Sequence, residues 1–304
     1  MVQLRFILSS KGYIMSNELT TSFADDDFAS AMGFSTEETS RSGPSLPRLS
    51  QMQSPIMVEG LDADGELEEK VVVPLGAFKL KDASGNEVYT RSAVLRLFAQ
   101  RQQWTQWDGV AGKMNKTVMV NVLKGDLKDT QGTFNNGRPS KYFKDWNTVD
   151  ADTQSLIRSI KNTKILFGKV TLGKTIDAAG NDVKGYEDEI DFVMDVKNTA
   201  SKKSIDEAIK GIKSKKLTPI EHTIKVSSKK ETMATGNKYA TIVASLGSIM
   251  RMKEGDQDTL RSFVDYVDYA NDYVLGEWKK LNKPDVAIDP KILDAIVQVE
   301  EIPF

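Results

Sequence analysis

The chain has 304 residues, with 41 basic and 43 acidic side chains, one histidine and no cysteine. The lack of cysteine excludes a disulfide framework, a thiolate nucleophile and a cysteine-based zinc site, and one histidine excludes a multi-histidine metal site. The formal net charge of −2 hides an uneven distribution. Residues 1–69 carry a net charge of −8, residues 70–253 one of +13 and residues 254–304 one of −7. A basic centre between acidic ends indicates a polyanionic partner.

The N-terminal part does not look like a folded segment. Residues 16–69 are rich in Ser, Thr, Asp, Glu and Pro and have little apolar periodicity, so residues 1–69 are predicted to form an acidic, mostly disordered arm. The apolar stretch at residues 2–8 is too short for a membrane span or a signal segment. Met15 begins a stretch typical of a natural start, which leaves open whether residues 1–14 are translated natively. We expect a cytoplasmic protein with no membrane partner.

Short β-rich segments dominate from residue 71 onward. The turn-forming run Asp82–Asn86 predicts a hairpin, and Asp150 or Asp152 is placed to cap a short helix over residues 149–161. The predicted strands cover residues 71–73, 77–80, 87–90, 94–98, 116–123, 164–172 and 186–196. This order, with a helix ahead of the last two strands, is that of an OB barrel. We therefore expect a β-rich α+β fold whose residues 70–253 form an OB-like five-stranded barrel with additional strands.

The remaining elements follow that barrel. Apolar side chains at helical spacing predict a helix over residues 204–215, and strands at residues 223–226 and 238–244 are predicted to form another hairpin. Residues 258–281 have the strongest helical pattern, with an apolar stripe on one side and aspartates on the other. Residues 254–304 are thus predicted to be a long C-terminal helix and an acidic tail. The stripe suits a core or a subunit interface, so a homo-oligomer stays open.

One motif in the chain suggests nucleotide binding. Residues 168–175 fit the P-loop pattern, ending in Gly173-Lys174-Thr175. A P-loop needs a strand before it and a helix after it, but residues 175–183 predict a turn, so we interpret the match as chance. His222 lies in a strand-like stretch and is expected to be a packed or solvated residue, because a catalytic histidine needs a partner within reach. We expect no enzymatic activity, no catalytic residues, no metal and no cofactor.

Two stretches combine basic and aromatic side chains. Lysine and arginine neutralise phosphates, and flat rings stack unpaired bases at about 1–3 kcal/mol each, so the combination is typical of proteins that hold single strands without regard to sequence. At each position the alternative, that the ring packs inside a barrel or its loops, stays open. The candidate DNA-binding residues are Arg91, Arg96, Phe98, Arg101, Trp104, Trp107, Lys113, Lys116, Arg138, Lys141, Tyr142, Phe143, Lys144 and Trp146.

The last five residues are Glu300, Glu301, Ile302, Pro303 and Phe304. This ending resembles the C-terminal tip of bacterial single-stranded-DNA-binding proteins, in which acidic residues precede a terminal Ile-Pro-Phe. In that family the tip docks replication, recombination and repair proteins, and the resemblance implies the same partners for these five residues. A terminal ring with a free carboxylate suits an apolar pocket with a basic rim. The sequence departs from the family in lacking its long flexible linker.

These observations favour one function and leave two others open. We expect a sequence-independent single-stranded-DNA-binding protein of DNA replication, recombination and repair. Its acidic flanks resemble those of phage-encoded single-strand binders with OB folds, which implies action in the host cytoplasm. The alternatives are a non-enzymatic structural or assembly protein of a virion and an annealing protein for recombination. The sequence does not decide between DNA and RNA, and it gives neither site size nor strand polarity.

Overall fold

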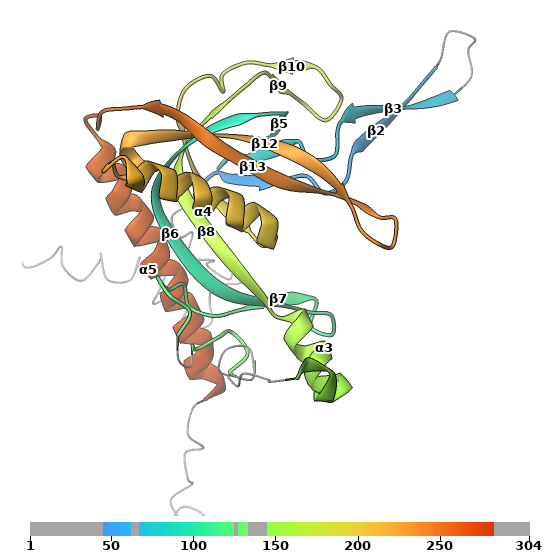
Figure 1. The fold of residues 1–304 in the computed structure, drawn as a ribbon, viewed down its shortest axis with the longest axis vertical. Helices are drawn as coiled ribbons and strands as arrows, with labels where there is room; N and C mark the ends of the chain where they lie inside the picture. Colours follow the sequence, from blue (N-terminus) through green and yellow to red (C-terminus); the bar gives the residue numbers. More distant parts are fainter. Residues whose placement is uncertain (1–44, 62–66, 125–126, 133–144, 283–304) are drawn as a thin grey trace, which may run out of the picture. The chain divides into compact units, whose positions relative to one another are not determined.

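The computed structural model describes residues 45–61, 67–124, 127–132 and 145–282, all of which belong to one compact unit (Figure 1). Three α-helices and two 3-10 helices are described: η3 (Trp146–Thr148), α3 (Ala151–Ser159), α4 (Thr199–Ser214), η4 (Pro219–Glu221) and α5 (Asp256–Leu281). The described strands are β1 (Arg48–Gln51), β2 (Ile56–Leu61), β3 (Leu67–Val73), β4 (Phe78–Lys81), β5 (Glu87–Thr90), β6 (Ala93–Asp108), β7 (Lys113–Lys116), β8 (Lys161–Leu172), β9 (Thr175–Ile176), β10 (Asp182–Val183), β11 (Ile190–Val196), β12 (His222–Thr232) and β13 (Lys238–Ile249).

Most of these strands form one mixed sheet. Its order is β10-β9-β5-β4-β1-β11-β8-β6-β12-β13, with β7 paired to β6, while β2 and β3 form a separate ribbon. Among the described pairs only β1 and β11 run parallel. The strand order has two ends, β10 and β13, so hydrogen bonding between strands does not close the sheet. The predicted β-rich fold with a C-terminal helix is confirmed, but the OB-like five-stranded barrel is not.

Some local sequence signals produce the elements that they predict, although the strand predicted over residues 116–123 does not form and β7 ends at Lys116. The Asp82 carboxylate accepts a hydrogen bond from the Asn86 N–H at 2.9 Å and shapes the turn between β4 and β5. The Asp150 carboxylate caps α3 by accepting from the Thr153 N–H at 2.7 Å. The predicted pairing of β12 with β13 and the helices α4 and α5 are also confirmed.

The folded unit begins earlier than the sequence indicates. Strand β1 lies between β4 and β11 in the main sheet, and β2 pairs with β3 in the ribbon, although both fall within the predicted acidic arm. The Leu49 side chain of β1 is completely buried in the core. The boundary predicted at residue 69 is therefore too late, because one short strand inside a polar stretch completes the sheet.

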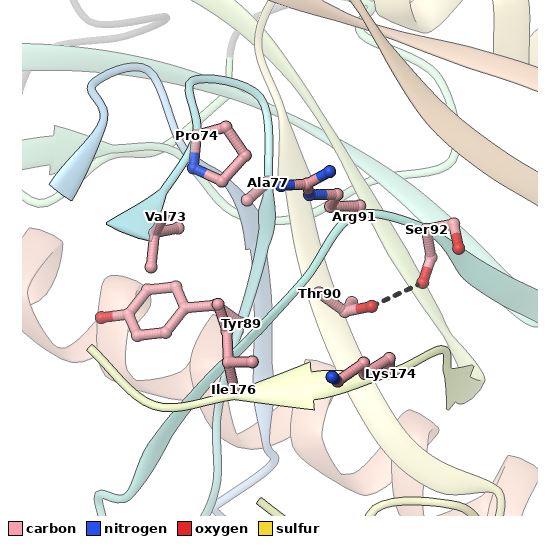
Figure 2. A pocket seen from close by; sticks show the side chains of 9 residues that line it. All are labelled: Val73, Pro74, Ala77, Tyr89, Thr90, Arg91, Ser92, Lys174 and Ile176. Atoms are coloured by element: carbon pink, nitrogen blue, oxygen red, sulfur yellow. Dashed lines mark hydrogen bonds between the residues drawn. The ribbon is translucent and has the colours of Figure 1, made fainter. Parts of the chain in front are cut away.

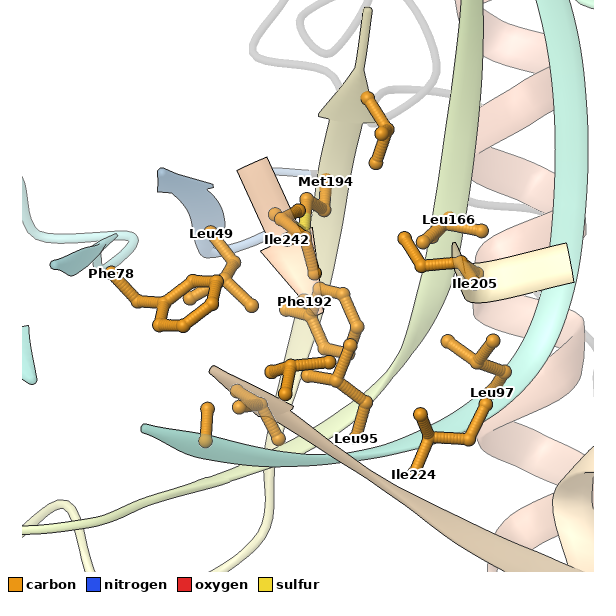
Figure 3. Close-up of a cluster of buried hydrophobic side chains, with 14 of the residues drawn as sticks. Leu49, Phe78, Leu95, Leu97, Leu166, Phe192, Met194, Ile205, Ile224 and Ile242 are labelled. Atoms are coloured by element: carbon orange, nitrogen blue, oxygen red, sulfur yellow. The ribbon is translucent and has the colours of Figure 1, made fainter. Parts of the chain in front are cut away.

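Two helices cover opposite faces of the sheet. Adjacent residues of β8 point to opposite sides, so Leu166 packs with Ile205 of α4 in the main core (Figure 3), whereas Phe167 packs with Phe263 of α5. The rings of Phe167 and Phe263 lie 5.7 Å apart. We call the two sides of the sheet the α4 face and the α5 face.

A bulge in β6 changes which side chains face α5. The register of β6 against β8 shifts between Leu97 and Ala99. As a result, the neighbouring residues Phe98 and Ala99 both pack in the cluster of buried side chains that includes Phe263 of α5. The bulge is possible because residue 168 is glycine: a Cβ atom there would overlap the carbonyl oxygen of Arg96. The first glycine of the P-loop pattern thus serves close packing of two strands.

The other sequence motifs have structural roles. In the P-loop pattern, Gly168 to Leu172 belong to β8 and Thr175 begins β9, so a strand stands where a P-loop has its helix. His222 is fully buried at the start of β12, as expected, with its Nδ1 2.8 Å from the Thr223 carbonyl oxygen. Among the described residues, no helix is long and apolar enough to span a membrane, and no three acidic or histidine side chains cluster as metal ligands.

Candidate nucleic-acid interface

Beyond the bulge, β6 extends away from the main core and places its two tryptophans on opposite faces. Gln102 pairs with Lys164, which forms an ion pair with Asp206 of α4, so even-numbered residues here face α4. Trp104 therefore lies on the α4 face and Trp107 on the α5 face, because side chains three positions apart in a strand point to opposite sides. The two indoles cannot stack on the same run of bases.

Trp107 is the most exposed of the described tryptophans, at 61% of its full surface. It pairs with Met114 of β7, and the next pair with side chains on this face is Thr105 with Lys116. The Lys116 ammonium lies 5.4 Å from the ring centre of Tyr273 in α5, which is itself 53% exposed. We call Trp107, Met114, Lys116 and Tyr273 the Trp107 face.

The charge of Lys116 is sensitive to its surroundings. Burial lowers the pKa of the Lys116 ammonium, and the positive charge of Arg48 lowers it further, while Asp195 opposes the shift. Arg48 is itself held by an ion pair with Asp195 at 3.0 Å. As pH rises, Lys116 therefore loses its proton before an ordinary lysine does.

Trp104, on the other face, has a different neighbourhood. It pairs with Asn162 of β8, whose carbonyl oxygen accepts a hydrogen bond from the Lys202 ammonium of α4 at 2.8 Å. Burial lowers the pKa of Lys202, and the nearby charge of Lys164 adds to that effect. Trp104 is only partly exposed, so this face offers less free ring surface than the Trp107 face.

Two predicted DNA-binding residues have structural roles instead. The Arg96 side chain is 1% exposed and forms a buried ion pair with Asp256, and its Nε donates to the Ile220 carbonyl at 2.9 Å. Phe98 packs edge-on against Phe263, with ring centres 5.8 Å apart. The prediction that Arg96 contacts phosphate is wrong, because its donors are used inside the protein. Phe98 is half-buried beneath α5 and is poorly placed to stack a base.

The other described candidates are spread over the sheet. Arg101 is half-buried on the α5 face and donates to the Gln100 carbonyl at 2.9 Å, and Lys113 is exposed at the start of β7. Trp146 is half-buried in η3, with the Arg158 guanidinium 5.7 Å from its ring centre. Arg91 precedes β6 and lines a cavity (Figure 2). From Arg91 to Trp107 the chain can span up to about 50 Å, at ~3.3 Å per strand residue.

The structure therefore brings together some of the predicted residues and adds others. Tyr273 and Met114 belong to the Trp107 face and were not predicted; a tyrosine in an acidic helix and a methionine near a turn carry no distinctive signal. Ten predicted residues lie outside the described part of the chain, namely Arg138, Lys141, Tyr142, Phe143, Lys144, Glu300, Glu301, Ile302, Pro303 and Phe304.

Comparisons with protein-family models, with curated proteins and with solved structures find no match for this chain.

Proposed function

We propose that this protein binds single-stranded DNA without regard to sequence, in replication and recombination, and that it is phage-encoded. The observation that supports this most directly is the Trp107 face, where an exposed indole stands on a paired strand beside Lys116 and Tyr273. A ring held by a strand loses little conformational freedom when a base stacks on it. Aromatic rings beside a cation match the requirements of an unpaired strand: stacking for bases and positive charge for phosphates.

Charge elsewhere on the folded unit supports the same function. Lysines 203, 210 and 213 of α4 and lysines 225, 229 and 230 of β12 are all exposed. Such a distribution raises the local concentration of a polyanion and makes its affinity depend on salt. In this proposal the acidic ends of the chain compete with DNA for the basic surfaces when no strand is bound.

The test compares the same substitution on the two faces of β6. Trp107→Leu removes the exposed ring, and we expect a loss of about 1–3 kcal/mol in binding oligo(dT), which is roughly 5- to 150-fold in affinity. Trp104→Leu is the matched control on the α4 face and is expected to change affinity less than threefold. Titrations of intrinsic fluorescence and of a labelled oligonucleotide, each at two salt concentrations, measure both effects.

Two results would count against the proposal. The first is equal affinity for duplex and single strand, which would indicate nonspecific attraction to phosphate. The second is equal weakening by Trp107→Leu and Trp104→Leu, which would indicate a general loss of structure. An increased rate of pairing between complementary strands would instead favour the recombination annealing function.

We also propose that the tip formed by Glu300 to Phe304 docks replication and recombination proteins. This rests on its likeness to the bacterial tip and on the chemistry of a terminal phenylalanine. Deleting Ile302–Phe304 should leave oligo(dT) affinity unchanged and abolish binding to proteins that recognise the bacterial tip peptide. Unchanged binding to those proteins would refute the docking role without affecting DNA binding.

The β2–β3 ribbon favours the second candidate, a structural or assembly protein of a virion. The ribbon exposes Met57, Leu67 and Val71 and pairs Glu59 directly with Glu69. Like charges directly opposite destabilise a pair of strands, and two-stranded ribbons are marginally stable alone, so this ribbon suits a subunit contact. Met57→Ser with Val71→Ser should dissociate an assembly if this function is correct. Under the first proposal it leaves DNA binding intact.

A further inference from the structure

A cavity of about 370 Å³ lies between β5, β9 and the turn that joins β3 to β4 (Figure 2). Its walls are mainly apolar and include Val73, Pro74, Ile176 and the ring of Tyr89, while Arg91 and Lys174 also line it. Pockets that hold small ligands have volumes of roughly 300–1,000 Å³. The cavity is therefore large enough for one small ligand, and its lining suits a molecule that is partly apolar and partly anionic.

The walls are fixed by hydrogen bonds. The Tyr89 hydroxyl lies 3.0 Å from Glu87, which also pairs with Lys79 at 3.1 Å, so the ring is held in place. Tyr89 is 4% exposed and packs with Val73 and Ala77, so it makes this wall rigid but leaves little free ring surface. Pro74 and Ile176 are only partly buried, so they offer apolar surface against which a planar heteroaromatic group can pack.

The turn after β5 places both cations in the lining of the cavity. The Thr90 hydroxyl donates to the Ser92 carbonyl at 3.0 Å, as drawn in Figure 2. The Gly173 N–H donates to the same carbonyl at 3.2 Å, and Gly173 fits closely there because a Cβ atom would lie 3.1 Å from the Ser92 hydroxyl oxygen. This contact places Lys174, the next residue, on the same cavity as Arg91.

Both cations are accessible to an anion. Arg91 is exposed, and its guanidinium makes no ion pair or hydrogen bond with another residue in the described part of the chain. Lys174 pairs with Asp182 at 2.9 Å, but its side chain is 74% exposed. Exposed pairs of this kind contribute little to stability, so an incoming phosphate can replace Asp182 as the partner of Lys174.

We propose that this cavity binds one nucleotide unit of the single strand, with the base against Pro74 and Ile176 and the phosphate at Arg91, while Lys174 adds positive charge to the lining. This inference rests on the proposed function and adds a second contact at the opposite end of β6 from Trp107. The site accepts any base, because apolar walls do not read hydrogen-bonding edges.

The experiment uses thymidine 5′-monophosphate as the probe for the cavity and oligo(dT) as the probe for the whole interface. Arg91→Glu reverses the charge at the cavity, and Lys184→Glu makes a like change at an exposed lysine that does not line it. We expect wild type and Lys184→Glu to bind the nucleotide equally in a calorimetric titration. Arg91→Glu is expected to bind it at least tenfold more weakly and to lose oligo(dT) affinity beyond the loss in Lys184→Glu.

The outcomes separate this inference from the proposed function. The first case is that Trp107→Leu weakens oligo(dT) binding, the nucleotide does not bind, and Arg91→Glu and Lys184→Glu have the same oligo(dT) affinity. In that case the cavity inference is overturned and the proposed function stands. If inorganic phosphate competes as strongly as the nucleotide, the cavity does not hold a base and the inference is also overturned. Binding of the nucleotide with no binding of oligo(dT) overturns both.

Discussion

The guanidinium of Arg96 in β6 and the carboxylate of Asp256 in the first turn of α5 form a two-point ion pair between residues 160 positions apart. Neither side chain is accessible to solvent, at 1% and 0% exposure. The Lys253 N–H also donates to Asp256 at 2.6 Å, so the carboxylate accepts from backbone as well as side chain. The pair fixes the start of α5 on the sheet, and α5 in turn positions Tyr273 beside Lys116.

Removing Arg96 should cost much more stability than removing an exposed arginine. Arg96→Met leaves the Asp256 carboxylate buried and unpaired, and breaking a buried pair in this way costs about 3–5 kcal/mol. Arg91→Met is the matched control and should change the unfolding free energy by less than about 0.5 kcal/mol, because Arg91 is exposed. Urea unfolding measures both. If Arg96→Met were as stable as Arg91→Met, the pair would not stabilise the start of α5.

The same carboxylate makes stability depend on acid pH. Burial alone would raise the pKa of Asp256, but hydrogen bonds from Arg96 and the Lys253 N–H outweigh it and hold the pKa below its ordinary value. Because the folded pKa is depressed, the stabilisation is present above the unfolded value of about 3.9 and is lost as pH falls through the folded one. The stability gap between wild type and Asp256→Asn should therefore narrow below about pH 4. A gap that stayed constant from pH 7 to pH 3 would contradict this.

Because of the bulge in β6, we expect substitution of Gly168 to reduce the stability of the fold. Gly168→Ala places a methyl group against the Arg96 carbonyl oxygen and forces β6 and β8 apart. Overpacking of this kind costs about 1–3 kcal/mol, and a shifted bulge would also disturb the Arg96–Asp256 pair. Gly60→Ala is the control, since Gly60 also lies in a strand but a Cβ atom there would meet nothing within 4 Å. Thermal unfolding should show a clear loss for the first variant alone.

The sequence predicts those parts of the fold that depend on neighbouring residues. The Asp82–Asn86 turn and the Asp150 cap are local hydrogen-bonding patterns, and both form as expected. The parallel pairing of β1 with β11 joins Leu49 to Met194, and no local pattern encodes such a distant contact. The extension of β6 past Phe98 was also missed, because its consecutive polar residues show no clean alternation.

Prediction of the site had the same limit. Residue type identifies Trp107 and Lys116 as candidates, since exposed strands with tryptophan and lysine are typical of nucleic-acid binders. Residue type does not show that the bulge at Phe98 sets which side chains of β6 face α5. It also does not show that Arg96 has a buried acidic partner in a distant helix. Both facts depend on tertiary packing.

Because the pKa of Lys116 is lowered, we expect DNA affinity to fall as pH rises into the alkaline range. Its pKa is lowered by burial and by Arg48, so this ammonium loses its charge before exposed lysines do as pH rises. Affinity for oligo(dT) should therefore begin to weaken at a pH below about 10.4, the pKa of an ordinary lysine, while exposed lysines are still mostly charged. Lys116→Arg should remove this weakening, because arginine stays protonated. If Lys116→Arg has the same pH profile as wild type, Lys116 does not contact phosphate.

Strand β13 forms one edge of the main sheet, and its hydrogen bonds to α4 lead to a prediction about stability and self-association. Strand β13 ends the strand order, yet its Ile242 and Ala244 N–H groups donate to the hydroxyls of Ser201 and Ser204 in α4, at 2.9 and 2.8 Å. Edge strands with free N–H groups pair with other chains, and these two serines occupy the donors that would do so. Ser201→Ala with Ser204→Ala should cost about 1–3 kcal/mol for the buried Ile242 donor left without a partner, and less for the part-buried Ala244 donor. It should also cause self-association that rises with concentration.

Light scattering over a range of concentrations, together with urea unfolding, measures both effects of the serine substitutions. Ser214→Ala is the control on the same helix, since its hydroxyl bonds only to the Gly211 carbonyl of α4. That variant should remain as stable and as dispersed as wild type. Loss of stability without self-association would mean that α4 still covers the edge strand sterically. The two serine hydroxyls would then contribute hydrogen bonds but would not be needed to prevent association between copies of the chain.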